Sequence, residues 1–377
     1  MKLNERNEVI IQSLEQLLDH IYAHRSLRRC TLQDLDLTRV QVPWEELKMQ
    51  DTTLLGCELS PRLETLLRNQ GATIYPRVNG HPYHPFRRSL YTWQELMEGY
   101  DPNNDQSTDL QIYEHFSRSR FNPGITEALN QRIHDHSIDE ALRKLVGFQD
   151  NGMTERKCVG FMGGHGALRS DEFYRKTAIA ARSLAAQGYL VVSGGGPGIM
   201  EAANLGAYFA NFEEAELEKA IEILAEAAHY TDADYIAKSH EVLSRYPKGH
   251  ENLAIPTWFY GHEPSNLFAS HIAKYFSNSI REDNLLAISL FGVVYAPGSA
   301  GTTQEIFQEA AQNHYATYGY YSPMAFLSRE RYEIKTSLFP LLKQLAWEKP
   351  YFDMLFLSDE PQEIVDFILA HPPIPKS

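Results

Sequence analysis

The chain has 377 residues, of which 43% are hydrophobic and 22% charged, and its formal net charge is −14. This length predicts two or three domains and provides enough apolar residues for a large core. The acidic balance excludes general binding to a nucleic acid polymer, because phosphate backbones are bound by clustered Lys and Arg. Any site for an anion must therefore be local.

The cysteine pattern and the N-terminal sequence indicate the compartment. Cys30, Cys57 and Cys158 are far apart and lack metal-ligand spacing, so we interpret them as buried thiols in a reducing environment. The first residues, MKLNERNEVIIQ, lack the apolar core of a signal peptide, and no apolar run approaches transmembrane length. We expect a cytoplasmic protein with no membrane partner.

Residues 1–150 are expected to form an accessory domain of unknown role that is mixed but mainly helical. Apolar spacing and turn residues give the expected elements, which are helices over 4–25, 61–70 and 125–146 and a strand over 72–75. Short alternating fragments between 30 and 59 resemble a β repeat but are too brief to assign. His81 and His84 lie in an irregular stretch, and because no third ligand is placed by spacing, we predict no metal site.

From Cys158 onward, strands and helices alternate. This order predicts an α/β domain over 155–373 with a Rossmann-like parallel sheet flanked by helices. Expected strands cover 158–162, 189–192, 253–260, 287–295, 321–327 and 354–357. Expected helices cover 171–187, 200–209, 266–281, 334–347 and 359–369, and a further helix starts at Thr302. A charged, mostly helical insertion around 211–250 interrupts the alternation.

Three glycine-rich segments follow predicted strands: GGHG at 163–166, SGGGPG at 193–198 and PGSAG at 297–301. Ligands collect at the carboxyl ends of parallel strands, and a helix start behind a small-residue loop offers free amides to a phosphate. The alternative for the third segment is a capping box over 302–305 that needs no ligand. The second segment does not match the dinucleotide-binding motif G-x-G-x-x-G, because Ile199 stands in place of its third glycine. The sequence also lacks the Gly-Lys-Ser/Thr ending of a Walker motif. No cofactor is implied.

The segments SGGGPGIMEAAN and PGSAGTTQE, taken together, resemble the LOG ("Lonely Guy") family of phosphoribohydrolases, which are often mislabelled lysine decarboxylases. The resemblance covers about 157–371 and is greater to the bacterial nucleotide 5′-monophosphate nucleosidase branch. Ser299 departs from the family's PGG, and both the insertion and the N-terminal part lie outside the minimal family. The resemblance implies a hydrolase that cleaves the N-glycosidic bond of an AMP-like nucleoside monophosphate, releasing free base and ribose 5-phosphate.

The resemblance also implies roles for individual residues. Glu305 would contact the ribose and stabilise an oxocarbenium-like transition state, and Arg281 would hold the base or the phosphate. Glu201 would be a second carboxylate on the ribose side, with a solvated first-turn acid as the alternative. The expected nucleotide- and phosphate-binding residues are Gly163, Gly164, His165, Gly194, Gly195, Gly196, Gly198, Gly298, Ser299, Gly301, Thr302 and Thr303.

Two further expectations complete this interpretation. The aromatic stretch around His262 and Glu263 could stack a base on Trp258 or Tyr260, although packing explains those aromatic residues equally well. The resemblance implies a homodimer or larger homo-oligomer. A non-catalytic nucleotide sensor of the same superfamily is the alternative function, and the presence of Glu305 together with Arg281 favours the enzyme.

Overall fold

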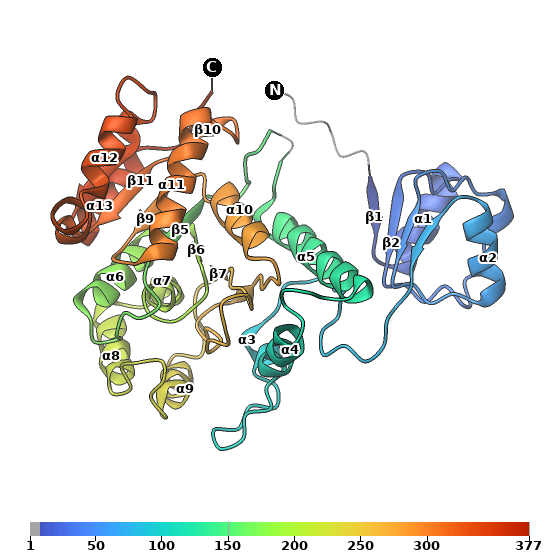
Figure 1. Ribbon diagram of the computed structural model, residues 1–377, viewed down its shortest axis with the longest axis horizontal. Helices are drawn as coiled ribbons and strands as arrows, with labels where there is room; N and C mark the ends of the chain where they lie inside the picture. The colour runs from blue at the N-terminus through green and yellow to red at the C-terminus, as the bar shows by residue number, and fades with distance from the viewer. Residues whose placement is uncertain (1–7, 150, 377) are drawn as a thin grey trace. The chain divides into compact units, whose positions relative to one another are not determined.

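The computed structural model describes residues 8–149 and 151–376, and the chain divides into two compact units (Figure 1). The smaller unit comprises the described residues of 2–89 together with 122–141. The larger unit comprises 90–121 and the described residues of 142–377. The sequence placed a boundary near 150, whereas the contacts within the chain assign 90–121 to the larger unit.

The smaller unit contains a parallel sheet in which each strand pairs with the next along the chain. Its elements are β1 (Val9–Ile11), α1 (Leu14–His24), β2 (Cys30–Gln33), η1 (Trp44–Glu46), β3 (Thr53–Leu55), α2 (Pro61–Asn69) and β4 (Thr73–Tyr75). The helix expected over 4–25 begins only at Leu14, because Ser13 caps it by accepting a hydrogen bond from the Gln16 amide. Its strands have only three or four residues, which is too short to show a periodic pattern in the sequence.

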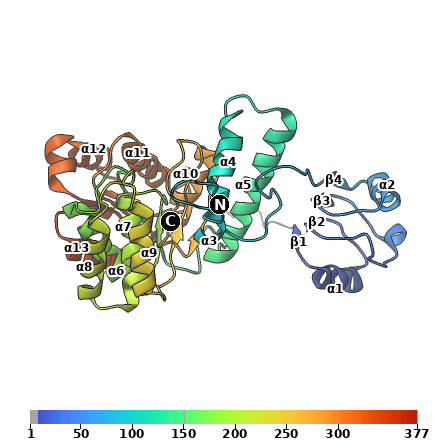
Figure 2. The ribbon, with the colours of Figure 1, turned by 90° about the horizontal axis from the view of Figure 1, so that it is seen from below.

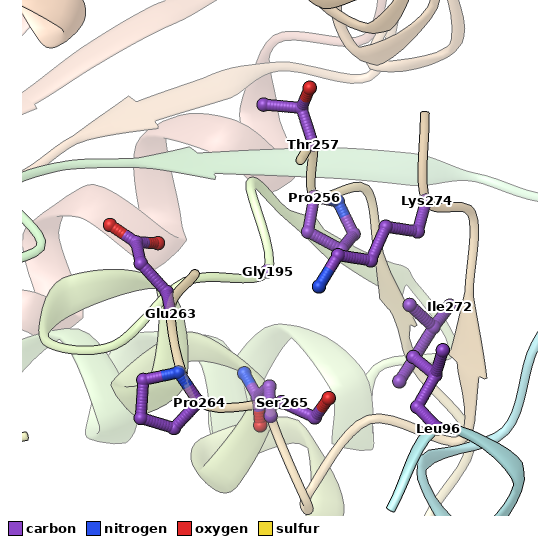
Figure 3. Close-up of a pocket in the computed structure, with 10 residues that line it drawn as sticks. Leu96, Gly195, Pro256, Thr257, Glu263, Pro264, Ser265, Ile272 and Lys274 are labelled. Carbon is purple, nitrogen blue, oxygen red and sulfur yellow. The ribbon is translucent and has the colours of Figure 1, made fainter. Parts of the chain in front are cut away.

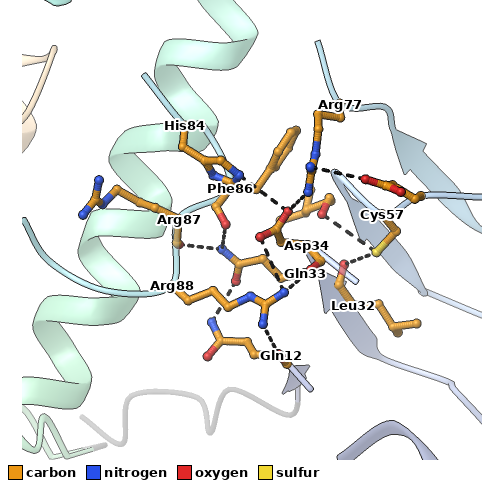
Figure 4. Close-up of polar contacts among 12 residues, drawn as sticks. Gln12, Leu32, Gln33, Asp34, Cys57, Arg77, His84, Phe86, Arg87 and Arg88 are labelled. Atoms are coloured by element: carbon orange, nitrogen blue, oxygen red, sulfur yellow. Dashed lines mark hydrogen bonds and ion pairs between the residues drawn. The ribbon is translucent and has the colours of Figure 1, made fainter. Parts of the chain in front are cut away.

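A buried glutamine ties this sheet to the segment that carries the two histidines (Figure 4). Gln33 Nε2 donates to the carbonyls of Phe86 at 3.2 Å and Arg87 at 2.9 Å. His81 and His84 contact different carboxylates, since His81 Nδ1 lies 3.3 Å from Glu127 and His84 Nε2 lies 3.5 Å from Asp34. The two histidines therefore do not share one carboxylate ligand.

The three cysteines are buried and form no disulfide, as expected. Burial raises the pKa of Cys30 and of Cys57 to about 11, and it raises the pKa of Cys158 to about 12. At neutral pH all three are thiols, which are poor nucleophiles and poor metal ligands.

The larger unit contains a seven-stranded sheet in the order β12-β11-β9-β5-β6-β7-β8, and every neighbouring pair is parallel. The strands are β5 (Cys158–Met162), β6 (Leu190–Ser193), β7 (Leu253–Ala254), β8 (His271–Ile272), β9 (Val293–Tyr295), β11 (Met324–Leu327) and β12 (Leu355–Ser358). A separate antiparallel pair joins β10 (Tyr320–Tyr321) to β13 (Ile374–Pro375). The Rossmann-like α/β class is confirmed.

Helices cover both faces of this sheet. Figure 2 shows α6 (Glu172–Ala186), α7 (Ile199–Tyr208) and α13 (Pro361–Ala370) on one side, and α10 (Asn278–Ile288), α11 (Ala300–Tyr315) and α12 (Leu338–Leu345) on the other. The remaining helices are α3 (Trp93–Leu96), α4 (Thr108–Ser117), α5 (Ile125–Val146), α8 (Glu214–Ala225) and α9 (Tyr235–Arg245). Shorter helical turns are η2 (Phe209–Asn211), the π-helical η3 (Glu330–Lys335) and η4 (Phe352–Met354). The unit boundary falls within α5, after residue 141.

The close contact of α6 with α7 sets the position of the second glycine segment. A Cβ atom at Gly206 in α7 would lie only 2.1 Å from the carbonyl oxygen of Ala178 in α6. Buried alanines continue this contact over the apolar β5 and β6. Because α7 is held this close to α6 and the sheet, the loop that precedes it is held at the carboxyl end of β6.

Three expected elements differ from the structure, all near the edge of the sheet or where apolar runs join. The helix expected over 266–281 is replaced by β8 and by α10, which begins at Asn278. The strand expected over 287–295 is only Val293–Tyr295, because α10 extends to Ile288 and shares the same apolar run. The strand expected over 253–260 ends at Ala254, shortly before Pro256. Among the described residues, no helix combines the length and apolarity needed to cross a bilayer.

One carboxyl group of α11 is buried and has no counter-ion in the part of the chain that the structure describes. Glu309 is 3% exposed, and within the described residues its Oε2 atom has no hydrogen bond. Its Oε1 atom accepts only a long bond of 3.5 Å from Asn313 Nδ2. Burial raises the pKa of Glu309 from 4.5 to about 8, so the folded protein holds this proton at neutral pH.

We predict that Glu309→Gln flattens the pH dependence of stability. The raised folded pKa contributes stability that is fully present below the unfolded pKa of 4.5 and is lost as the pH rises through 8. Between about pH 5 and pH 9 the free energy of unfolding of the variant should fall by about 4 kcal/mol less than that of the wild type. Urea unfolding at both pH values measures this difference, and parallel pH profiles would contradict the assignment.

Candidate functional site

A cleft of about 540 Å³ lies at the carboxyl ends of β5, β6 and β9. Three glycine-rich segments, the stretch that follows β7, and residues of α10 and α11 form its walls. The lining residues are Gly163, Gly164, His165, Gly194, Met200, Tyr230, Pro256, Thr257, Tyr260, Gly261, His262, Glu263, Arg281, Ser299, Ala300, Gly301, Thr302, Gln304 and Glu305. The structure thus brings together segments separated by more than a hundred residues.

Gly164 connects the three glycine-rich segments. Its amide donates to the Pro297 carbonyl at 3.0 Å, and its own carbonyl accepts from the Ile199 amide at 3.1 Å. A Cβ atom at Gly163 would lie 2.4 Å from Ile199 Cγ2, and one at Gly198 would lie 2.5 Å from the Gly164 oxygen. These glycines are needed first for the packing of loop against loop, and not only for the approach of a ligand.

A fully buried asparagine fixes the second glycine segment. Asn204 Oδ1 accepts hydrogen bonds from Ser193 Oγ at 2.6 Å and from Asn266 Nδ2 at 2.8 Å. Ser193 Oγ in turn accepts from the Gly195 amide at 3.0 Å. Asn204 Nδ2 donates to Asn252 Oδ1 at 2.8 Å. The network joins the end of β6, α7 and the stretch before β8, and sequence reasoning missed it because polar partners so far apart leave no local pattern.

The start of α11 faces the cleft without a side-chain cap. The helix begins at Ala300, and the side chain of its N-cap residue, Ser299, makes no capping hydrogen bond. Thr302 therefore lies inside the first turn and not at the cap, which contradicts the capping-box alternative. Ala300, Gly301 and Thr302 all line the cleft. Amides of an uncapped helix start are suited to an anion.

Arg281 and Glu305 meet inside the cleft. Arg281 Nη1 lies 3.4 Å from Glu305 Oε1, and Arg281 Nη2 donates to Asn278 Oδ1 at 3.0 Å. Within the described residues, the buried Nε atom of Arg281 has no hydrogen-bond partner. Burial raises the pKa of Glu305 to about 7; Arg281 opposes this shift and Glu282 adds to it. The pair therefore offers an unused donor beside a carboxyl that exchanges its proton near neutral pH.

Glu201 lies outside this cleft, in a buried ion pair. Arg169 Nε donates to Glu201 Oε2 at 2.9 Å, and Arg169 Nη2 donates to Oε1 at 2.6 Å. Tyr174 adds a hydroxyl donor at 2.9 Å. With 3% exposure, Glu201 is not the solvated first-turn acid considered from the sequence. Arg169 also donates to Ser239 of α9, so the pair links α7 to the insertion.

The predicted site residues divide into two groups. Those that line the cleft are Gly163, Gly164, His165, Gly194, Arg281, Ser299, Gly301, Thr302 and Glu305. Those that do not line it are Gly195, Gly196, Gly198, Glu201, Gly298 and Thr303. Gly198 and Gly298 are tightly packed against neighbours: a Cβ atom at Gly298 would lie 2.1 Å from Thr302 Oγ1. The individual roles assigned to these residues stay predictions.

The stretch after β7 supplies a wall of the cleft next to the second glycine segment. Tyr260, His262 and Glu263 line the cleft, and the Tyr260 hydroxyl accepts from Asn278 Nδ2 at 2.9 Å. Trp258 is fully buried and does not line the cleft; it packs edge-on against Tyr91. Of the two aromatic residues considered for stacking, only Tyr260 faces the cleft.

Comparison with known proteins finds no matching family model and no matching curated protein. Similar solved structures include the molybdenum cofactor binding protein from Rippkaea orientalis, with 13% identity, 57% of this chain and 97% of that chain covered, and a TM-score of 0.37. Another is the molybdenum cofactor carrier protein from Chlamydomonas reinhardtii, which is 15% identical. That match covers 58% of this chain and 100% of the carrier protein, with a TM-score of 0.36. Likeness this weak carries no argument about a ligand.

These findings correct the family interpretation. The similar structures are molybdenum cofactor carrier and binding proteins and not LOG phosphoribohydrolases, and no family model supports the resemblance. The predicted N-glycosidic hydrolase, the nucleotide sensor and the nucleoside monophosphate partner followed from the LOG resemblance and are overturned with it. The expectation of a homo-oligomer came from the same resemblance and loses its basis. Short glycine-rich motifs misled because they also satisfy the packing of loops around Gly164.

We predict that Glu201 supports the fold and does not act on a ligand. Glu201→Ala would leave the buried Arg169 charge unpaired and should lower the free energy of unfolding by about 3 to 5 kcal/mol. The control Glu218→Ala breaks an exposed pair with Arg175 and should cost less than about 1 kcal/mol. Urea unfolding compares the two. A Glu201 variant as stable as the control would contradict the structural role.

Proposed function

We propose that the protein binds a small oxyanion-bearing molecule, with a phosphate or similar group held at the start of α11. The observation that carries this proposal is that Arg281, whose Nε has no hydrogen bond among the described residues, and the uncapped start of α11 line the same cleft. Both features stabilise negative charge, one through a charge-assisted hydrogen bond and the other through oriented amides. Both belong to residues that line the same cleft.

The composition of the cleft limits the size and charge of this ligand. Arg281 is the one Lys or Arg among its lining residues, which also include the carboxyl groups of Glu263 and Glu305. A single anionic group fits this balance, whereas a polyanion would be repelled in a chain of charge −14. The volume of about 540 Å³ lies within the range usual for small-molecule sites.

We predict that Arg281→Met weakens the binding of sulfate and methyl phosphate by about tenfold to a hundredfold, as expected for the loss of hydrogen bonds from a charged group. Isothermal titration calorimetry measures both anions. Arg175→Met removes an exposed arginine on α6 and should leave the affinities unchanged. The molybdenum cofactor bound or carried by the compared proteins can be titrated as an additional probe. Absence of anion binding by the wild type would refute the proposal.

We propose as a second function that Glu305 acts as a general acid or base on the bound molecule. Its pKa of about 7 allows it both to hold and to release a proton near neutrality, which is what such catalysis requires. Its carboxyl group lies in the same cleft as Arg281, within reach of a molecule that occupies the anion site. The chemistry supported is proton transfer, with no particular bond assigned.

We predict that anion binding takes up a proton at Glu305. Sulfate does not itself titrate near neutrality, and its negative charge should raise the pKa of the nearby carboxyl further. At about pH 7.5 the wild type should take up about half a proton per sulfate bound. Titration calorimetry in buffers of different ionisation enthalpy measures this uptake, which Glu305→Gln should abolish. Equal uptake by the variant would exclude Glu305 as the group that titrates.

A further inference from the structure

A buried aspartate of α4 organises the wall of the cleft that follows β7. Asp109 is 1% exposed, and both of its carboxyl oxygens accept from Lys274 Nζ, at 2.7 and 2.8 Å. Asp109 also accepts from Trp258 Nε1 at 2.7 Å and from Ser265 Oγ at 3.1 Å. Asp109 therefore fixes the chain at positions 258 and 265, on either side of Tyr260, His262 and Glu263, which line the cleft.

The carboxyl group of Glu263 lies between these two fixed points. Its Oε2 atom lies beside the second glycine segment, because a Cβ atom built at Gly196 would be 2.6 Å from it. In Figure 3 this carboxyl group points away from the amino group of Lys274, whose charge is directed to Asp109 instead. Within the described residues, the Glu263 side chain makes no hydrogen bond or ion pair.

Glu263 thus differs from Glu305 in the cleft and from the two buried acids outside it. Glu201 is paired with Arg169, Asp109 with Lys274, and Glu305 with Arg281. The neighbouring His262 does not supply a charge, because burial lowers its pKa, with partial opposition from Asp109. A half-buried carboxylate that faces a cleft without a protein partner is suited to a cation or to strong N–H donors on a ligand.

We infer that Glu263 determines specificity by binding an amino or other cationic nitrogen group of the ligand, while the anion of the same molecule lies at α11. This inference rests on the proposed oxyanion site and extends it to a ligand class, the phosphate-bearing amines. Asp109 is a positioning residue, because it touches no ligand but holds the stretch from 258 to 265 that carries Glu263. The ligand bridges two poles of opposite charge in one cleft.

The test uses a series of ω-aminoalkyl phosphates of increasing chain length, each compared with the alkyl phosphate of the same length. Because the chain length varies, the series finds the spacing between the anion site at α11 and the Glu263 carboxyl group, and no value for that spacing has to be chosen beforehand. Titration calorimetry at about pH 8, where the amine is protonated and the phosphate is a dianion, gives the affinity ratio for each pair. We expect the amine of best length to bind about tenfold more tightly than its alkyl counterpart in the wild type.

Glu263→Gln should abolish this advantage, measured as the affinity ratio within each pair, and should not weaken the binding of the alkyl phosphate. Glu222→Gln, at an exposed position of α8, is the matched control and should keep the advantage. Asp109→Asn should reduce the tighter binding of the amine and should alter the fluorescence of Trp258. If that variant does not fold, Ser265→Ala also loosens the segment that carries Glu263, because it removes one hydrogen bond to Asp109.

The possible outcomes separate the two proposals. If no alkyl phosphate binds, the oxyanion site itself is refuted. If alkyl phosphates bind and no amine in the series gains affinity, the oxyanion site stands and the role of Glu263 is refuted. An advantage that survives in Glu263→Gln would likewise overturn the inference, because the amine would then be held by another carboxylate.

Discussion

The cleft depends on one backbone position, Gly164, whose two peptide groups connect the loops after β5, β6 and β9. Parallel strands place their carboxyl ends at one edge of a sheet, but they do not by themselves set the distance between the loops that follow. Here the hydrogen bonds of Gly164 to Pro297 and Ile199 set it. The starts of α7 and α11 are consequently held close together, and the uncapped start of α11 faces the cleft.

Electrostatics in this space depend on which charges are paired. The chain is acidic as a whole, yet the cleft contains one arginine whose Nε has no partner among the described residues, and a helix start without a side-chain cap. Glu305 remains close to Arg281 and has its pKa raised to about 7, so the site can adjust its charge when an anion arrives. A local anion site in an acidic protein requires this kind of compensation.

Two buried ion pairs outside the cleft show a different use of charge. Arg169 with Glu201 joins α7 to the helical insertion, and Lys274 with Asp109 joins α4 to the wall of the cleft. Each pair is surrounded by further hydrogen bonds, which is the condition under which buried charges are tolerated. Both fix segments that are distant in the sequence, so the insertion and the segment 90–121 help to shape the site although neither belongs to the core strand-loop-helix pattern.

The sequence by itself determined the central α/β elements, because their signals are local: β5 spans Cys158–Met162 as predicted, and buried apolar runs followed by glycine and helical periodicity located β6, α6 and α7. Tertiary structure alone decided which acid is available. Glu201, Glu263 and Glu305 look alike in sequence. Only the folded chain gives the first an arginine partner, leaves the second without an ion pair among the described residues, and desolvates the third. The family assignment failed for the same reason. The same glycine residues can serve loop packing or ligand binding, and only the contacts between distant loops show which of these two roles they have.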